Sequence, residues 1–472
     1  MLRFVRLAIV ALFISFTPAF ADDKPLTRIA LGSCADQDKP LPIYDKIVEL
    51  KPELLILLGD NIYADLDKSR KVTTEIIQEK YDILAKLPGW QKLKATCPMV
   101  VTWDDHDYGK NDAGVEWPLK EDSQKIFLDF FGIPKDSPRR TQKGVYNSAI
   151  FGPPGKRVQV IALDMRYHRT KLNRAEKPLA GTRIVPYLPT TDADATFLGA
   201  EQWMWLEEQL RQPADLRLIG SGLQVVSDEH PFEKWTNVPA EREKLYKVIR
   251  NTGATGVVIL SGDRHLGELS LDTSSVGYPL YDLTSSGFNQ ASKEWRAPEK
   301  NSHRVAAMPY GDNFGFITLD WDAPSPIVGL QLRDVTGEIV LKQTFPISLL
   351  KPDPKEADKP KVPEGVLTPL EAIKKVGEEV TVQMEVVAGR AVSGGKRILL
   401  NSDKDFNSDK NFTVVVNEKA MTGKFEKATY DTFKGKTIRA KGKVTLFKDA
   451  PQIQIDDAKL LEIVDEKEKK AP

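Results

Sequence analysis

The run "VTWDDHDYGKNDAG", from Val101 to Gly114, places three carboxylates and one imidazole in four consecutive positions, Asp104 to Asp107. It includes the end of the apolar run "PMVV", which is typical of a short buried strand. Like charges crowded at a buried strand end repel one another and raise the carboxyl pKa values unless a cation is bound among them. The run therefore predicts a cation site where this strand ends.

The chain on both sides of this run alternates apolar stretches rich in β-branched residues with amphipathic stretches. The strands we expect are "LTRIALGSC", "ELLILLGDN", "CPMVVTWDDHD", "RVQVIALDMR", "DLRLIGSGLQV" and "TGVVILSGDRH". Helical patterns such as "PIYDKIVELKP" and "AEQWMWLEEQLRQ" lie between them. This alternation predicts an α/β layered fold. After His265 only strand patterns follow, which predicts a second sheet that completes a sandwich.

The sequence also predicts a second, smaller domain. The segment 351–365, "KPDPKEADKPKVPEG", is rich in proline and charge and is typical of a linker. Residues 366–465 then give three strands, a helix and two strands, which is the order of an all-β OB-like barrel. Its charge is nearly balanced and its aromatic residues are few, so we expect a structural or docking module.

Composition limits the partners and the N-terminus indicates the compartment. Lysine plus arginine equals aspartate plus glutamate at 67 each, so we expect no nucleic-acid partner. Arg3 and Arg6 precede an apolar run that ends in "AFA", which predicts a signal peptide over residues 1–21. That run is shorter than the roughly 20 residues of a spanning helix. We expect a secreted or periplasmic protein with no transmembrane anchor after cleavage.

Polar residues of metal-ligand type follow four of the predicted strands. These residues are Cys34, Asp60 with Asn61 and Tyr63, Asp104 with Asp105 and His106, and Asp263 with His265. Ligands of α/β sheets gather at the carboxyl ends of strands, so we expect these side chains to converge. Asp60 is the candidate bridge between two cations about 3.5–4 Å apart, which would turn a shared water into hydroxide at neutral pH.

Four of these positions allow another interpretation. Cys34 and Cys97 are the two cysteines of the chain and could form one disulfide. Asp60 and Asp263 each follow a glycine and could be ordinary turn residues. Tyr63 could be a packing residue, whereas as a phenolate ligand it would favour a hard ion such as ferric iron.

As an ordered set, several motifs resemble a known family. They are "GSC", "GDNIY", "WDDHDYGKNDAG", "LDMRYHR", "LSGDRHLGEL" and "LTSSG". The set resembles the PhoD-like (alkaline phosphatase D) branch of the calcineurin-like metallophosphatases, over roughly residues 26–350. The resemblance implies an αββα sandwich and a centre containing Fe³⁺ and Ca²⁺. It implies an iron site formed by Cys34, Asp60, Tyr63 and His265, and a calcium site formed by Asp60, Asp105 and Asp263. The hard oxygen ligands of the second site suit calcium.

The resemblance also implies roles for two further residues. His106 would contact the phosphoryl oxygen and protonate the leaving group. Arg166 would neutralise phosphate oxygens, and the alternative is a structural ion pair with Asp164. The remaining histidines, His168, His230 and His303, lack a matching context and are interpreted as surface or loop residues.

We therefore expect a secreted binuclear phosphatase or phosphodiesterase that hydrolyses phosphate esters through attack by a metal-bound hydroxide. The alternative is a cell-surface binding module in which the phosphatase scaffold is inactive. Metal analysis of the purified protein separates the two hypotheses.

Overall fold

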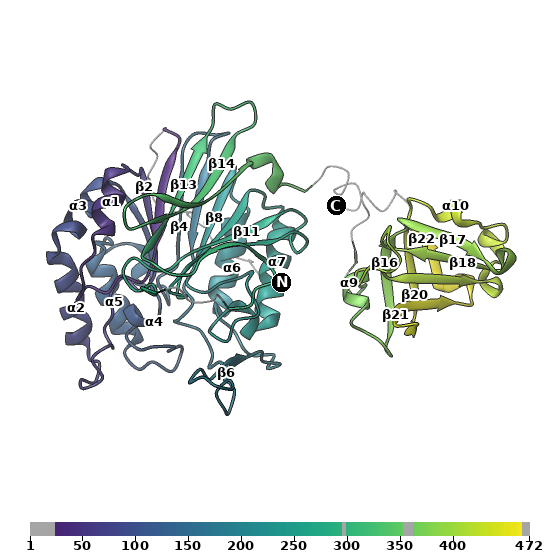
Figure 1. The fold of residues 1–472 in the computed structure, drawn as a ribbon, viewed down its shortest axis with the longest axis horizontal. Coiled ribbons are helices and arrows are strands. Elements are labelled where there is room, and N and C mark those ends of the chain that lie inside the picture. Colours follow the sequence, from purple (N-terminus) through teal and green to yellow (C-terminus); the bar gives the residue numbers. More distant parts are fainter. Residues whose placement is uncertain (1–23, 295–298, 353–361, 364, 465–472) are drawn as a thin grey trace, which may run out of the picture. The chain divides into compact units, whose positions relative to one another are not determined.

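The computed structural model describes residues 24–294, 299–352, 362–363 and 365–464 (Figure 1). The predicted signal peptide, residues 1–21, lies outside this part, as does much of the predicted linker. By its internal contacts the chain divides into two compact units, Met1–Asp353 and Pro354–Pro472. The boundaries at 351–365 and 366–465 remain a prediction. None of the described helices is long and apolar enough to cross a membrane.

The first sheet of the first unit contains the three N-terminal strands in parallel. Its strand order is β15-β14-β13-β1-β2-β3, and the three C-terminal strands of the unit join it antiparallel. The bounds are β1 (Arg28–Gly32), β2 (Leu54–Leu58), β3 (Met99–Thr102), β13 (Asn313–Asp320), β14 (Ile327–Asp334) and β15 (Ile339–Pro346). Helices on one side of this sheet (Figure 1) are α1 (Ile43–Glu49), α2 (Thr74–Lys86), α3 (Pro88–Thr96) and α5 (Lys120–Phe130).

The second sheet has the order β12-β10-β11-β9-β8-β5-β4, with β5, β8, β9 and β11 parallel. The bounds are β4 (Asn147–Phe151), β5 (Val158–Ala162), β8 (Leu216–Ser221), β9 (Val257–Ser261), β10 (Gly267–Asp272), β11 (Leu280–Ser285) and β12 (Arg304–Met308). Helices α6 (Gly199–Leu210) and α7 (Pro239–Thr252) pack on it through buried residues such as Trp203 and Leu245. Outside the sheets lie α4 (Asp105–Tyr108), β6 (Asn173–Arg174), β7 (Tyr187–Leu188) and the 3-10 helices Pro138–Arg140, Trp235–Asn237 and Ile347–Leu350.

Alternating side chains of the first sheet enter two different cores. Ile29, Leu31 and Ile56 pack between the sheets, whereas Ala30 and Leu55 pack under the helices. A strand that is buried on both faces reads as a continuous apolar run, which is why "LLILL" shows no polar alternation. Two sheets covered by outer helices form the predicted αββα sandwich, and the α/β class is confirmed.

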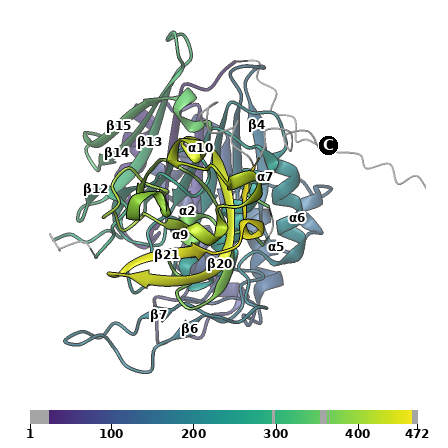
Figure 2. The ribbon, with the colours of Figure 1, turned by 90° about the vertical axis from the view of Figure 1, so that its right-hand side faces the viewer.

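The second unit is all-β apart from short helices (Figure 2). Its strand order is β16-β20-β21-β19-β18-β17, with β22 on β20. The bounds are β16 (Glu379–Glu385), β17 (Ala388–Val392), β18 (Arg397–Asn401), β19 (Thr413–Asn417), β20 (Thr437–Phe447), β21 (Ala450–Ile455), β22 (Leu461–Ile463), α9 (Pro369–Ala372) and α10 (Tyr430–Phe433). Its 3-10 helices are Ser393–Gly395, Glu418–Ala420, Gly423–Phe425 and Ala458–Leu460.

Two details of this unit differ from the sequence prediction. The expected first strand is broken into β16 and β17, which join different partner strands, and the short strand β22 was missed. In the described part of the chain β16 and β17 do not pair with each other, so no closed barrel is found and the OB-like assignment remains a prediction. The unit has a hydrophobic core of its own, which includes Val382, Val414 and Ile453.

Candidate metal centre

Most of the polar residues predicted at the strand ends come within a few residues of the end of a strand. Several of them have a left-handed backbone conformation, which is rare for residues other than glycine. Cys34, Asp60, Asp263 and His265 adopt left-handed φ values of 63°, 50°, 63° and 56°. Among the described residues nine non-glycine residues have positive φ, so four of the nine are predicted metal ligands. This conformation costs about 1–2 kcal/mol per residue and is found preferentially at functional sites. The strand ends are therefore shaped to turn these side chains toward one point.

The predicted iron ligands lie together. The Asp60 Oδ2 atom is 3.5 Å from the Cys34 Sγ and 3.2 Å from the Tyr63 hydroxyl. The Tyr63 hydroxyl is also 3.1 Å from the His265 Nε2. Ligand atoms of Cys34, Asp60 and His265 all lie within 4.8 Å of one another. A thiol, a carboxylate, a phenol and an imidazole thus face one small volume.

Two further groups of ligand atoms adjoin the first one. Asp60, Asp105 and His106 form one group, and Asp104, Asp105 and Asp263 form the other, each within 4.8 Å. Asp60 belongs to the first and second groups, and Asp105 belongs to the second and third. This overlap is what a bridging aspartate requires. It also adds Asp104, which was expected to converge with the other residues but was not assigned to either ion.

The electrostatics of these groups fit a bound cation. Burial raises the pKa of Asp60 and that of Asp263 well above their ordinary value, and burial raises the pKa of Asp104 to about 7. Among the described residues the Asp104 Oδ2 and the Asp105 Oδ1 are buried and have no hydrogen-bond partner. Buried carboxylate oxygens without donors are costly unless a cation satisfies them. The donor set therefore fits the metal ions that the sequence implies.

The two cysteines are both free thiols, so the alternative of a disulfide is not realised. Cys34 is buried after β1, where its Sγ lies 3.1 Å from the Ser286 Oγ and 3.3 Å from the Ser33 Oγ. Burial, together with the Asp60 charge, raises the pKa of the Cys34 thiol. Cys97 lies at the C-terminal end of α3. The Cys34 sulfur is thus available to a metal ion.

His106 is held by a carboxylate that the sequence analysis missed. The His106 Nδ1 lies 2.5 Å from the Asp65 Oδ1, and the Asp65 Oδ2 accepts a hydrogen bond from the backbone N–H of Asn111 at 2.8 Å. Burial lowers the pKa of His106, but the charges of Asp105, Asp60 and Asp65 outweigh it and raise this pKa well above its usual value. The stretch "YADLD", which begins at Tyr63, contained the signal, because it places an acid a few residues beyond the end of the strand.

The fourth residue of the "DDHD" run has a different task. Residues Asp105–Tyr108 form the helical turn α4 rather than an extension of the strand, so Asp107 points back toward β2. Its carboxylate accepts hydrogen bonds from the Asn61 backbone N–H, the Asn61 amide and the Tyr81 hydroxyl. Asp107 therefore ties the ends of the second and third strands together. The expectation that the whole run faces a cation is corrected at this position.

Arg166 lies behind the carboxylates, and its side chain is fully buried. Its guanidinium binds Asp104 through Nε and Glu233 through Nη1, the latter at 2.6 Å, while Nη2 lies 3.7 Å from the Asp105 Oδ1. The alternative ion pair with Asp164 is not formed. The Asp164 carboxylate instead accepts a hydrogen bond from the backbone N–H of Arg166 at 2.8 Å. Glu233 is far from Arg166 in the sequence and belongs to none of the motifs, so this ion pair was not predicted.

The remaining histidines lie outside the three ligand groups. His230 is in a loop, as expected, but it is buried rather than on the surface, and burial lowers its pKa well below the usual value. His303 contacts the Leu271 carbonyl, and His168 packs against Gly199. None of the three belongs to a group of candidate ligands in the described residues.

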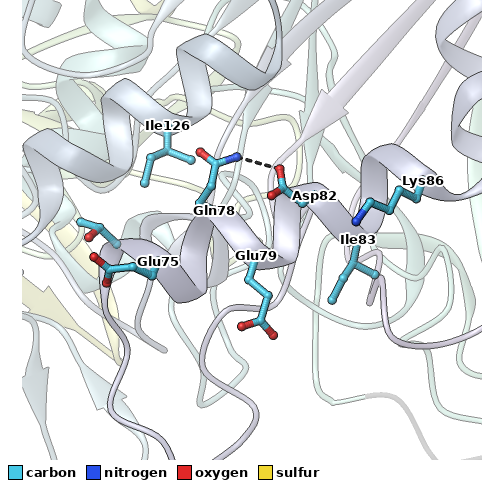
Figure 3. A pocket seen from close by; sticks show the side chains of 8 residues that line it. Glu75, Gln78, Glu79, Asp82, Ile83, Lys86 and Ile126 are labelled. Carbon is cyan, nitrogen blue, oxygen red and sulfur yellow. Dashed lines mark hydrogen bonds between the residues drawn. The ribbon is translucent and has the colours of Figure 1, made fainter.

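A cavity of about 340 Å³ opens onto the ligand groups. It is lined by Asp105, His106, Asn111, Asp112, Arg174, Arg183, Ile184, Val185, Tyr187, Pro231, Phe232, Glu233, Asp263, Arg264 and His265. A larger hollow of about 510 Å³ lies along α2 (Figure 3), where Gln78 donates to Asp82 at 2.9 Å. That hollow contains none of the predicted site residues, so the cavity at His106 and Asp263 is the candidate substrate site.

Comparison with known proteins gives the family. A sequence model of the PhoD-like phosphatases matches residues 29–270. The chain belongs to the PhoD-like phosphatase family. Alkaline phosphatase D of Bacillus subtilis (strain 168) is 26% identical over 286 residues, which are 52% of this chain and 47% of that protein. The chain thus matches about half the length of this curated relative.

A solved structure of PhoD has a similar fold. The TM-score is 0.52 at 18% sequence identity, and the match covers 72% of this chain and 76% of that chain. The family resemblance carried by the sequence motifs is confirmed.

Gly59 tests how tightly the strand ends are packed. It has a φ of 107°, and a Cβ atom there would lie 2.5 Å from both the Cβ and the backbone N of Asp104. We expect Gly59→Ala to lower the free energy of unfolding by about 3 kcal/mol or more, since left-handed strain and overpacking add. Gly155→Ala is the matched control, because its φ is 85° with nothing within 4 Å, and it should cost only about 1–2 kcal/mol. The free energies of unfolding are measured by urea denaturation. If both variants lost the same free energy, the close packing of Gly59 against Asp104 would be contradicted.

Metal binding has to displace protons from these carboxyl groups. A carboxyl whose pKa is raised by folding holds its proton longer in the folded chain, so Asp104 and Asp263 contribute less stability to the metal-free protein as pH rises from about 4 to about 7. Bound cations oppose this loss of stability at higher pH, because they bind the deprotonated carboxylates. We expect the rise in Tm on adding Ca²⁺ to chelator-treated protein to be larger at about pH 7 than at about pH 5. Scanning calorimetry that gave an equal or larger rise at the lower pH would contradict the site.

Proposed function

We propose that this chain is a metal-dependent phosphoric ester hydrolase with a binuclear centre. The observation that carries the proposal is the overlap of the three ligand groups at Asp60 and Asp105, beside a cavity that arginines also line. In this proposal Fe³⁺ is held by Cys34, Asp60, Tyr63 and His265, and Ca²⁺ is held by Asp60, Asp105 and Asp263. When bound, such cations supply the charge that makes water a nucleophile near neutral pH.

His106 is proposed as the general acid. Asp65 fixes the Nδ1 side of the ring, and the surrounding carboxylates raise the pKa of His106, which favours the protonated imidazole. The residue lines the cavity, so the Nε2 proton can pass to the oxygen of the departing alcohol. The Tyr63 ring lies against the imidazole, with ring centroids 4.2 Å apart, and limits its rotation.

Arg166 is proposed to support the carboxylates rather than to grip the phosphate. Its guanidinium is fully buried and already contacts Asp104 and Glu233. A fixed cation behind the carboxylates reduces their mutual repulsion and holds them in position for the metal ions. The arginines that line the cavity are better placed to meet an anionic substrate.

Replacing the proposed bridge tests the function. We expect Asp60→Asn to lower the turnover of phosphate esters by more than about a hundredfold and to reduce the metal content, because an amide is a poor bridging ligand. The matched control is Asp67→Asn, an exposed acid in the same loop, which should leave both quantities unchanged. Turnover and metal content are measured on folded protein, as judged by circular dichroism. Wild-type-like hydrolysis by Asp60→Asn would contradict the proposal.

The substrate and the compartment are the finer parts of the proposal. A panel of 4-nitrophenyl phosphate and bis(4-nitrophenyl) phosphate separates phosphatase from phosphodiesterase activity. A metal-free protein that hydrolyses none of these esters would favour the alternative, a binding module on an inactive scaffold. Export is proposed from the signal-peptide pattern of residues 1–21, which N-terminal sequencing of the mature protein checks.

A further inference from the structure

The hairpin that connects β6 to β7 forms part of the candidate substrate site. Its strands pair at Arg174 and Tyr187, and backbone hydrogen bonds continue along it, from Ala175 to Pro186 at 3.0 Å and from Leu179 to Ile184 at 2.8 Å. Figures 1 and 2 both show it projecting from the body of the first unit. The hairpin is therefore an ordered arm.

The base of this arm is anchored next to the ligand groups. Tyr187 donates its backbone N–H to the Pro231 carbonyl at 2.8 Å and its hydroxyl to the Asp112 carboxylate at 2.6 Å. Asp112 in turn donates its backbone N–H to the Asp105 carboxylate at 2.6 Å. Two hydrogen bonds in series thus connect the arm to Asp105, a candidate metal ligand. They hold the base of the hairpin in position beside the candidate metal centre.

Two arginines of the arm line the same cavity as the carboxylates Asp105 and Asp263. Arg174 stacks its guanidinium 4.7 Å above the Tyr187 ring, and Arg183 lies nearer the tip. Both side chains are exposed, and among the residues that the structure describes no carboxylate lies within 4.0 Å of either guanidinium. Arg264, which lines the same cavity, differs because it is buried and forms an ion pair with Glu299 at 3.2 Å.

We propose that Arg174 and Arg183 form a second anion subsite that selects phosphate esters carrying another phosphate or carboxylate group. The inference rests on the proposed function, which places the scissile phosphate beside Asp105 and Asp263 in the cavity. Guanidinium groups bind phosphate and carboxylate oxygens in pairs, and stacking on Tyr187 orients one of them in advance. The cavity volume of about 340 Å³ is near the small end for ligand sites. The second anionic group should therefore lie within a few bonds of the scissile ester.

Binding of two non-hydrolysable ligands tests the subsite without turnover. Propylphosphonate carries one anionic group, and propane-1,3-bisphosphonate carries two. By calorimetry on the full chain supplied with Fe³⁺ and Ca²⁺, we expect the bisphosphonate to bind at least about tenfold more tightly. The double variant Arg174→Ala with Arg183→Ala should reduce this ratio to within about twofold, and the double lysine variant should keep an intermediate ratio because the charge remains.

Lys177→Ala is the matched control, since Lys177 is an exposed cation of the same hairpin that does not line the cavity, and its ratio should equal that of the wild type. A wild-type ratio near one, or a double alanine variant that keeps the wild-type ratio, would overturn the subsite. Turnover of the 4-nitrophenyl esters is measured on the same preparations. A binding preference without turnover would defeat only the proposed function, and turnover without a preference would defeat only the subsite.

Discussion

Repulsion between buried carboxylates is the constraint on which the rest of this structure depends. Asp60, Asp104, Asp105 and Asp263 belong to three overlapping groups of candidate ligands. Within each group the ligand atoms lie within 4.8 Å of one another. Arg166 neutralises part of this charge from behind, yet burial still raises the pKa of Asp60 and Asp263. The backbone is strained where it brings these carboxylates together. A bound cation is needed there, because unpaired charge inside a protein costs a large free energy.

The scaffold brings these groups together from both sheets. Strands β1, β2 and β3 of one sheet and β9 of the other end beside the same point, and the residues that follow turn sharply. Left-handed backbone at Cys34, Asp60 and Asp263 costs about 1–2 kcal/mol each, which the two apolar cores on either side of the first sheet offset. Gly59 allows the second strand end to approach Asp104, where a side chain would not fit. The rigidity of the sheets thus sets the geometry of the centre.

Much of this organisation could be predicted from the sequence, because buried parallel strands and polar strand ends leave a strong local pattern. The alternation of strands and helices indicated the α/β sandwich, and the ordered motifs indicated the PhoD-like family, which the family match confirms. The direction of individual side chains was harder to predict. Asp105–Tyr108 form a helical turn, so Asp104 belongs to the ligand groups and Asp107 does not, although the whole run was expected to face a cation. Glu233 was not predictable, because its partner Arg166 is brought to it only by the tertiary fold.

Locating the metal ions is the most direct test of the central claim. Crystals of the purified full chain, measured by X-ray fluorescence and by anomalous diffraction near the iron edge, would identify and place each ion. We expect an iron peak among Cys34, Asp60, Tyr63 and His265, and a second, lighter cation beside Asp105 and Asp263. Empty density around Asp60 in protein purified without chelator, or Cys34 joined to Cys97 in a disulfide, would contradict it.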